Sequence, residues 1–177
     1  MYEGVILAGF GGQGVISAGI LLAYAGMLED KFVTFFPSYG AEMRGGTANC
    51  TVVVSTEEVA SPIVETPTSI IVMNEPSLAM FEPKLKNGGL LFVNTSLVKS
   101  GASRKDVVVC DVPANELAEG VGNIRIANMV MIGAFCKKTG AIQLDSVFKA
   151  LPKVFPRAKP EMIEMNIEAI KKGASLI

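Results

Sequence analysis

One stretch near the N-terminus decides the fold class: Gly4-Val-Ile-Leu-Ala-Gly-Phe-Gly-Gly-Gln-Gly14, followed by Val15-Ile-Ser-Ala-Gly-Ile-Leu-Leu-Ala-Tyr-Ala-Gly-Met-Leu28. Residues 4–8 form an apolar run without a polar face, which is typical of a strand buried on both sides. The glycines that follow allow a sharp turn, and the small residues after them favour a helix over about 12–28, packed closely on a sheet. A second strand is predicted at 31–36, so the segment forms a Rossmann-like βαβ unit.

The rest of the chain extends this unit into a three-layer α/β/α fold with a mixed, mostly parallel sheet. Residues 47–55 are rich in β-branched side chains and follow the second strand without a helix, so we expect an antiparallel strand, with Val59-Ala60 as a short segment that pairs back. Further strands are predicted at 69–73, 90–94 and 107–112, and helices at 75–85, 114–119, 128–139, 144–151 and 161–172. No linker or repeat divides residues 1–177, so we expect one domain.

The composition excludes several classes of function. Half of the 177 residues are hydrophobic and 19% are charged, which indicates a folded core, and 16 basic against 17 acidic residues argue against nucleic-acid or membrane binding by bulk charge. The absence of histidine excludes a Ser-His-Asp triad, histidine metal sites and the commonest general base. Three scattered cysteines are too few for an Fe–S cluster or a Cys₄ zinc site, and are typical of reduced thiols in a cytoplasmic protein.

Neither a targeting signal nor a membrane segment is expected. Residues 1–28 are apolar, but no basic region precedes them and glycines interrupt them. Charge is distributed unevenly: residues 1–80 hold two basic and eight acidic residues, whereas residues 81–177 hold 14 basic and nine acidic residues. The basic part is either a solvated helical surface or a face that meets a partner or a phosphate-bearing ligand.

The first candidate site is the glycine turn, which satisfies the pattern G-x-G-x-x-G between a strand and a helix. Gly11, Gly12, Gln13 and Gly14 are its candidate binding or positioning residues, because backbone amides at a helix N-terminus attract anions. A dinucleotide fold places an acidic residue at the end of the second strand, but this strand ends in Thr34-Phe-Phe-Pro-Ser38. NAD binding is therefore disfavoured, and either a phosphate-type anion or close packing explains the glycines.

The second candidate site is the loop Ser38-Tyr-Gly-Ala-Glu-Met-Arg-Gly-Gly46, which leaves the carboxyl end of the second strand, at the sheet edge where α/β proteins bind ligands. Arg44 offers a planar fork to a ligand or to a partner chain, or it pairs internally with Glu42 or Glu75. Tyr39 is either a binding residue or packs against the first helix. The candidate residues of this loop are Tyr39, Glu42, Arg44, Gly45 and Gly46.

The two motifs together, Gly9-Phe-Gly-Gly-Gln-Gly-Val15 and Tyr39-Gly-Ala-Glu-Met-Arg-Gly-Gly46, resemble the gamma subunit of 2-oxoacid:ferredoxin oxidoreductases. The resemblance continues through Ser61-Pro62, 85–94, 128–133 and 166–173, and thus covers nearly the whole chain. It departs at Thr66-Pro67-Thr68, where the family pattern would have an aspartate.

The resemblance implies a role in a multi-chain enzyme that oxidatively decarboxylates a 2-oxoacid to an acyl-CoA, with ferredoxin as the electron acceptor. It assigns thiamine diphosphate and Mg²⁺ to alpha and beta subunits, and Fe–S clusters to a ferredoxin-like delta subunit. This chain would bind none of these cofactors alone and would have no catalytic residue; it would position partners and contribute to the coenzyme A path. A short separate chain is closer to the 2-oxoglutarate or branched-chain type than to the pyruvate type. The alternatives are a self-contained nucleotide-binding protein or NAD(P)-dependent dehydrogenase, and a purely architectural subunit.

Overall fold

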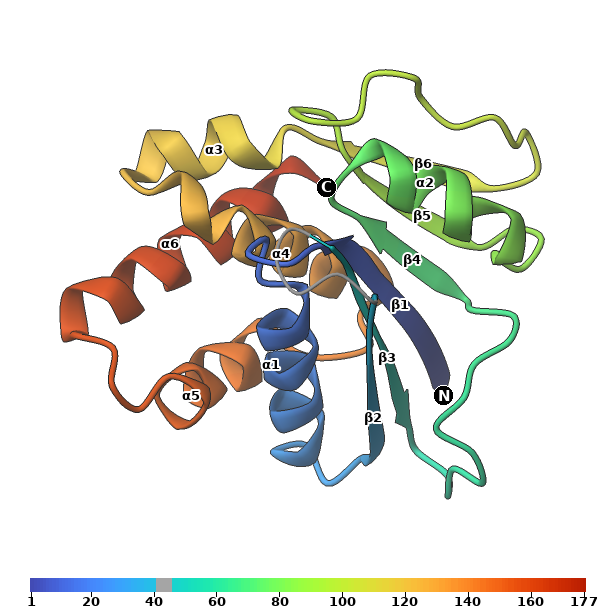
Figure 1. The fold of residues 1–177 in the computed structure, drawn as a ribbon. Coiled ribbons are helices and arrows are strands. Elements are labelled where there is room, and N and C mark those ends of the chain that lie inside the picture. The colour runs from blue at the N-terminus through green and yellow to red at the C-terminus, as the bar shows by residue number, and fades with distance from the viewer. Residues whose placement is uncertain (41–45) are drawn as a thin grey trace.

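The computed structural model describes residues 1–40 and 46–177. In this part of the chain a six-stranded sheet, in the order β2-β3-β1-β4-β5-β6, carries helices on both faces (Figure 1). Its strands are β1 Tyr2–Phe10, β2 Phe32–Tyr39, β3 Thr47–Ser55, β4 Ser69–Val72, β5 Leu90–Asn94 and β6 Val108–Val112. The helices are α1 Val15–Met27, α2 Glu75–Phe81, α3 Ala114–Val121, α4 Ala127–Thr139, α5 Leu144–Val154 and α6 Pro160–Leu176, with 3₁₀ turns η1 Glu82–Lys84 and η2 Ile124–Ile126.

The sheet is mixed because of one strand. β1, β4, β5 and β6 pair in parallel, whereas β3 is antiparallel to both of its neighbours, β1 and β2. The expected βαβ unit is present, but its two strands are not adjacent: α1 crosses over to β2, and β3 returns between β2 and β1. The predicted α/β fold with a mixed, mostly parallel sheet is confirmed.

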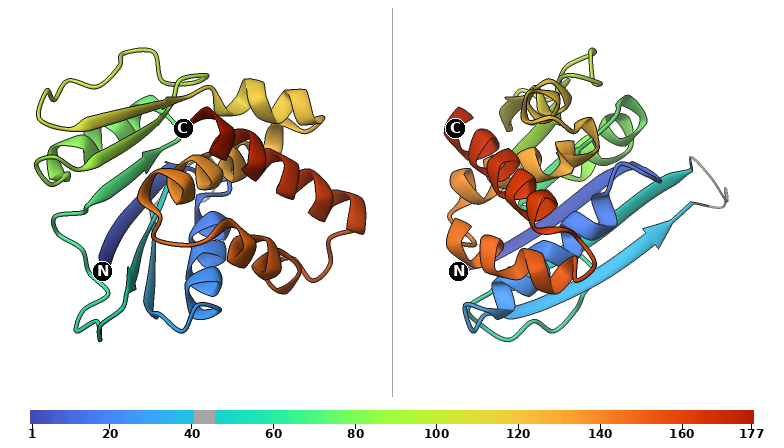
Figure 2. Two further views of the ribbon diagram at one scale, coloured as in Figure 1. Left: turned by 180° about the vertical axis from the view of Figure 1, so that it is seen from behind. Right: turned by 90° about the vertical axis from the view of Figure 1, so that its left-hand side faces the viewer.

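Alternate residues of β1 define the two faces. Val5 and Leu7 pack into the larger core under α1 and α3–α6, whereas Ile6 and Ala8 pack into a smaller core under α2 and η1. Figure 2 shows the larger helical layer from behind, with α6 crossing α4. None of the helices in the described residues is long and apolar enough to cross a membrane.

The crossing of α4 and α6 is unusually close. A Cβ atom on Gly133 of α4 would lie 1.9 Å from the carbonyl oxygen of Ile170, and one on Gly173 of α6 would lie 1.8 Å from that of Val130. Glycine at both positions therefore lets the two backbones touch. This contact seats the C-terminal helix against α4, whose residues 127–136 are all buried.

Three local expectations differ from the structure. Val59-Ala60 forms no strand, because β3 already pairs with β1 on one side and with β2 on the other up to Ser55. The helix that starts at Glu75 ends at Phe81 and continues only as a 3₁₀ turn that contains Pro83. α5 runs past Pro152 and ends two residues later at Val154, although Pro152 has no N–H to donate to the preceding turn.

Candidate binding site at the glycine turn

The turn between β1 and α1 depends on left-handed glycines. Gly12 has a φ of +97° and Gly14 has a φ of +72°, a region that residues with a Cβ atom rarely adopt. A Cβ atom on Gly14 would also lie 2.5 Å from Nδ2 of Asn128, whereas one on Gly12 would meet no atom of the described residues beyond its chain neighbours within 4 Å. Gly12 is thus required by the backbone alone, and Gly14 by the backbone and by its neighbour on α4.

The N-terminus of α1 is open. Gly14 is its N-cap, and within the described residues no side chain caps this end and no acidic residue lies in the first turn. The hydroxyl of Ser17 and Nδ2 of Asn128 both donate to the carbonyl oxygen of Gly14, at 3.0 and 2.9 Å. The backbone N–H groups of the first turn have no acceptor inside the helix, so they leave partial positive charge at this end.

The side chain of Gln13 is held inside the protein. Its Oε1 accepts hydrogen bonds from the backbone N–H of Phe10 at 2.7 Å and from Nδ2 of Asn74 at 2.9 Å. Its Nε2 donates to the carbonyl oxygen of Met73 at 3.3 Å. Since Asn74 is also the N-cap of α2, Gln13 ties the glycine turn to the end of β4 and the start of α2. Gln13 therefore fixes the glycine turn relative to β4 and α2.

The ends of the two sequence motifs meet. The backbone N–H of Gly11 donates to the carbonyl oxygen of Gly46 at 2.9 Å, and that of Gly40 donates to Thr47 at 2.7 Å. The glycine turn is thus hydrogen-bonded directly to the β2–β3 hairpin. Glu42, Arg44 and Gly45 lie outside the described residues.

A cavity of about 800 Å³ lies between these elements, lined by the glycine turn, the first turns of α1, and the ends of β2 and β3. Ile16 and Ile20 of α1 and the ring of Tyr39 form an apolar part, and Tyr39 is 69% exposed, so it is not tightly packed against α1. Apart from the Tyr39 phenol, the described lining contains no ionisable side chain. The described lining thus suits an anion and an apolar group, and it contains no thiol, amine or carboxylate that could act as a nucleophile or general base.

Glu75, considered from the sequence as an internal partner of Arg44, already has hydrogen-bond partners. Oε1 of Glu75 accepts from the backbone N–H groups of Lys99 and Ser100, and Oε2 accepts from the Ser100 hydroxyl at 2.6 Å. The hydroxyl and these two N–H groups lower the pKa of the Glu75 carboxyl. Glu75 is thus hydrogen-bonded to the loop after β5.

The cysteines are not placed for chemistry. Cys50, Cys110 and Cys136 are free and buried, and burial raises the pKa of each thiol, that of Cys50 to about 12. No group of three histidine, cysteine or acidic residues within 1–40 and 46–177 is close enough to hold a metal ion.

Sequence reasoning missed two residues that shape the site, Asn74 and Asn128. Asn128 is a buried amide in the otherwise apolar α4, and its partner, the Gly14 carbonyl, lies 114 residues away in the sequence. The sequence signal that could have identified Asn128 was a single amide within an apolar helical stretch. Such an amide usually has a hydrogen-bond partner when it is buried.

The turn, the open helix N-terminus and the adjoining cavity define a mixed α/β unit with a candidate anion-binding site. The chain belongs to the pyruvate ferredoxin/flavodoxin oxidoreductase family, whose profile matches residues 4–176. The family expected from the two motifs is therefore confirmed.

Two relatives show how this unit occurs. Ketoisovalerate oxidoreductase subunit VorA from Methanothermobacter thermautotrophicus is 40% identical over 172 residues, which are 96% of this chain; the chain spans only 35% of the length of VorA. The 2-oxoglutarate synthase subunit KorC from Methanothermobacter marburgensis is 36% identical over the whole chain and 97% of its own length. The unit thus occurs both as part of a longer polypeptide and as a separate subunit.

Solved structures share the fold. The gamma subunit of a keto/oxoacid ferredoxin oxidoreductase from Geobacter sulfurreducens superimposes with a TM-score of 0.84 at 25% identity, over 98% of this chain and 97% of that one. The 2-oxoglutarate:ferredoxin oxidoreductase from Magnetococcus marinus, solved with 2-oxoglutarate, coenzyme A and succinyl-CoA bound, superimposes with a TM-score of 0.87 at 25% identity. There the match covers 99% of this chain and 31% of the other.

Proposed function

We propose that this chain is the gamma subunit of a complex that oxidatively decarboxylates a 2-oxoacid to an acyl-CoA and passes the electrons to ferredoxin. Family membership and the match to a whole gamma subunit support this assignment. The names of both relatives favour a branched-chain 2-oxoacid or 2-oxoglutarate over pyruvate. In this complex the chain binds and positions, because the described cavity lining has no acid–base pair.

The chemistry is then carried out by partner chains in the cytoplasm. Alpha and beta subunits would supply thiamine diphosphate with Mg²⁺, and a ferredoxin-like delta subunit would supply the Fe–S clusters. Three buried thiols and a sequence without histidine are consistent with this division of labour.

The cavity at the glycine turn is our candidate for the coenzyme A path. One observation carries this proposal: the open N-terminus of α1 faces a cavity of about 800 Å³ that also has an apolar part. The backbone N–H groups of the first turn of α1 would take a phosphate, and Ile16, Ile20 and Tyr39 would contact a flat apolar group. The Magnetococcus relative, whose structure has coenzyme A bound, makes this ligand the first to test.

The geometry disfavours the alternative of an NAD(P)-dependent dehydrogenase. In a dinucleotide-binding sheet the second strand lies beside the first and ends in the acidic residue that holds the ribose. Here β3 occupies the place beside β1, and the described end of β2 is Ser38-Tyr39. The ribose hydroxyls would have no such carboxylate at that position.

A pair of substitutions at Ser17 tests the cavity. Ser17→Asp puts a negative charge in the first turn of α1, where it suits the helix but repels an anionic ligand. Ser17→Asn has nearly the same shape and no charge. In the assembled complex we expect Ser17→Asp to weaken coenzyme A binding about tenfold and Ser17→Asn about twofold or less, measured by calorimetry and by the KM for coenzyme A. Equal effects of the two variants, or a melting shift with NAD as large as that with coenzyme A, would contradict the proposal.

A further inference from the structure

The outer face of the sheet can be followed across three strands by its pairing. Ile6 of β1 lies under α2 and pairs with Thr51 of β3, which pairs with Phe36 of β2. Side chains of paired residues point to the same side of a sheet, so these three lie on the outer face. Two residues further along the strands, Asn49 of β3 pairs with Ser38 of β2, so these side chains lie on the outer face too. We call Phe36, Ser38, Asn49 and Thr51 the open sheet face.

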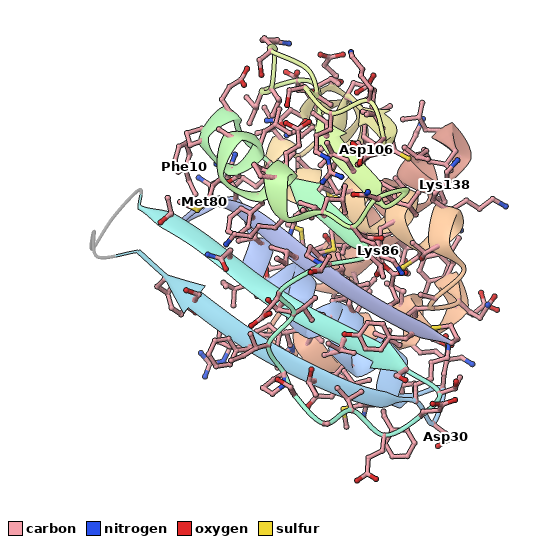
Figure 3. All side chains as sticks on the ribbon, turned by 90° about the vertical axis from the view of Figure 1, so that its right-hand side faces the viewer. Phe10, Asp30, Met80, Lys86, Asp106 and Lys138 are labelled. Atoms are coloured by element: carbon pink, nitrogen blue, oxygen red, sulfur yellow. The ribbon has the colours of Figure 1, made fainter. Side chains whose placement is uncertain are left out.

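This face loses its cover toward the edge of the sheet. Ile6 is 4% exposed beneath α2, whereas Phe36 is 48% exposed on β2. Residues 56–68 cross the other half of these strands (Figure 3), where Val64 lies over Gly4 and where Val53 and Ser55 are buried. Figure 3 shows α2 over part of this face, and next to it the part of β3 and β2 that no helix of the described residues covers. The open part is thus the half that adjoins the hairpin and the glycine turn.

The open sheet face is uncharged, although residues 1–80 hold eight acidic and only two basic residues. The flank of α2 beside it, near the Met80 label in Figure 3, is also uncharged and exposed, with Pro76, Ala79 and Met80. Depletion of charge together with exposed aromatic residues is typical of the centre of a protein interface. A matching surface must therefore be uncharged, apolar where it meets Phe36, and able to form hydrogen bonds where it meets Ser38 and Asn49.

The edge of β2 argues against an added strand. Because the N–H of Gly40 points inward to Thr47, the alternation of the ladder turns Pro37 outward, where it offers no N–H group. Proline on an edge strand blocks strand addition. A partner can therefore pack onto the face of these strands rather than along their edge. The faces of α/β sheets are normally covered by helices, as α2 covers β1, β4 and β5.

Relatives indicate where such a helix comes from. The unit fills only 35% of the VorA chain and 31% of the Magnetococcus chain, so in those polypeptides it is joined to further domains. We propose that the open sheet face is a docking surface for a helix of a partner chain, whose uncharged side places apolar residues against Phe36 and hydrogen-bonding residues against Ser38 and Asn49. This inference rests on the proposed function, because the partner is a larger subunit of the same complex.

The experiment uses this chain and the partner subunits of its complex. Phe36→Glu and Ser38→Glu each add a charge to the open sheet face, and Val108→Glu on the opposite edge strand, β6, is the matched control, since Val108 is 45% exposed. We expect both face variants to raise the Kd for the partner subunits about tenfold or more, and the control to stay within about twofold. Oxidative footprinting of Met80 provides a readout without any substitution: assembly should protect this side chain.

Each outcome is decisive. If the unmodified chain assembles and both face variants assemble equally well, with Met80 unprotected, the docking surface is wrong. If Phe36→Glu fails to fold, Ser38→Glu and the Met80 footprint decide. A stoichiometric dimer of the lone chain that Ser38→Glu abolishes would assign the face to a second copy and overturn the proposal. An unmodified chain that binds no thiamine-diphosphate-type subunit would instead refute the proposed function.

Discussion

At the residue scale, Gly12 and Gly14 have the same kind of backbone but different surroundings, and this difference can be measured. Alanine at either position costs about 1–2 kcal/mol because of the left-handed backbone. Gly14→Ala also brings a Cβ atom to 2.5 Å from Nδ2 of Asn128, while the space around Gly12 is empty within 4 Å. We expect Gly14→Ala to lower the free energy of unfolding by clearly more than Gly12→Ala, as measured by urea denaturation. Equal losses would show that Asn128 moves away at no cost.

The buried thiols make stability depend on pH. Burial keeps them protonated in the folded chain and raises the pKa of Cys50 from 9.0 to about 12. Above pH 9 the unfolded chain loses these protons and the folded chain keeps them, so the free energy of unfolding falls as pH rises from about 9 toward 12. Cys50→Ala should make this fall shallower. A slope that is the same in the variant would mean that other groups cause it.

The same burial predicts low thiol reactivity. A thiolate is the reactive form, so the folded chain should react with a disulfide reagent at pH 8 far more slowly than the unfolded chain. Cys110, the least buried of the three, should react first. Rapid labelling of Cys50 in the folded chain would contradict its placement.

At the element scale, the crossing of α4 and α6 is the contact most sensitive to a single methyl group. Gly133→Ala would force apart two backbones that now approach closely enough to leave no room for a Cβ atom. We expect the free energy of unfolding to fall by about 3 kcal/mol or more. Gly120→Ala in α3 is the matched control, because a Cβ atom there meets nothing within 4 Å. The control should be neutral or stabilise by up to about 1 kcal/mol.

Elements differ in how far the sequence could predict them. The sequence predicted α1 and α4–α6 as helices with approximately correct limits. Their apolar patterns, and the glycines or prolines that bound them, lie within each segment itself. The position of β3 between β1 and β2 was not. It depends on a hairpin that returns along β1 over nine residue pairs, from Tyr2–Ser55 to Phe10–Thr47, and pairing at that distance leaves no local signature.

At the scale of the whole molecule, we expect the isolated chain to be folded, colourless and inactive. Its core is large, but its three thiols are buried and it has no histidine to act as a general base. The measurements are circular dichroism, visible absorbance with iron analysis, and turnover of a 2-oxoacid with coenzyme A and an electron acceptor. Activity should return on addition of the partner subunits. Unaided turnover, or stoichiometric iron in the purified chain, would contradict this division of labour.

The sequence by itself determined the α/β class, the turn and the family, because each rests on local features. The apolar run at 4–8, the glycines from Gly9 to Gly14 and the motif at 39–46 can be recognised without knowing what they touch. The open N-terminus of α1 follows from the same glycines, which provide no capping side chain.

Only the tertiary structure decided how these pieces form a site. The Gln13 amide binds Asn74, Asn128 binds the Gly14 carbonyl, and the Gly11 N–H binds Gly46, so segments 35 to 114 residues apart converge around one cavity. The open sheet face likewise exists only because β3 lies between β1 and β2, while α2 covers the same face of the sheet over β1, β4 and β5. Such contacts depend on packing between distant segments, which local propensity and periodicity do not encode.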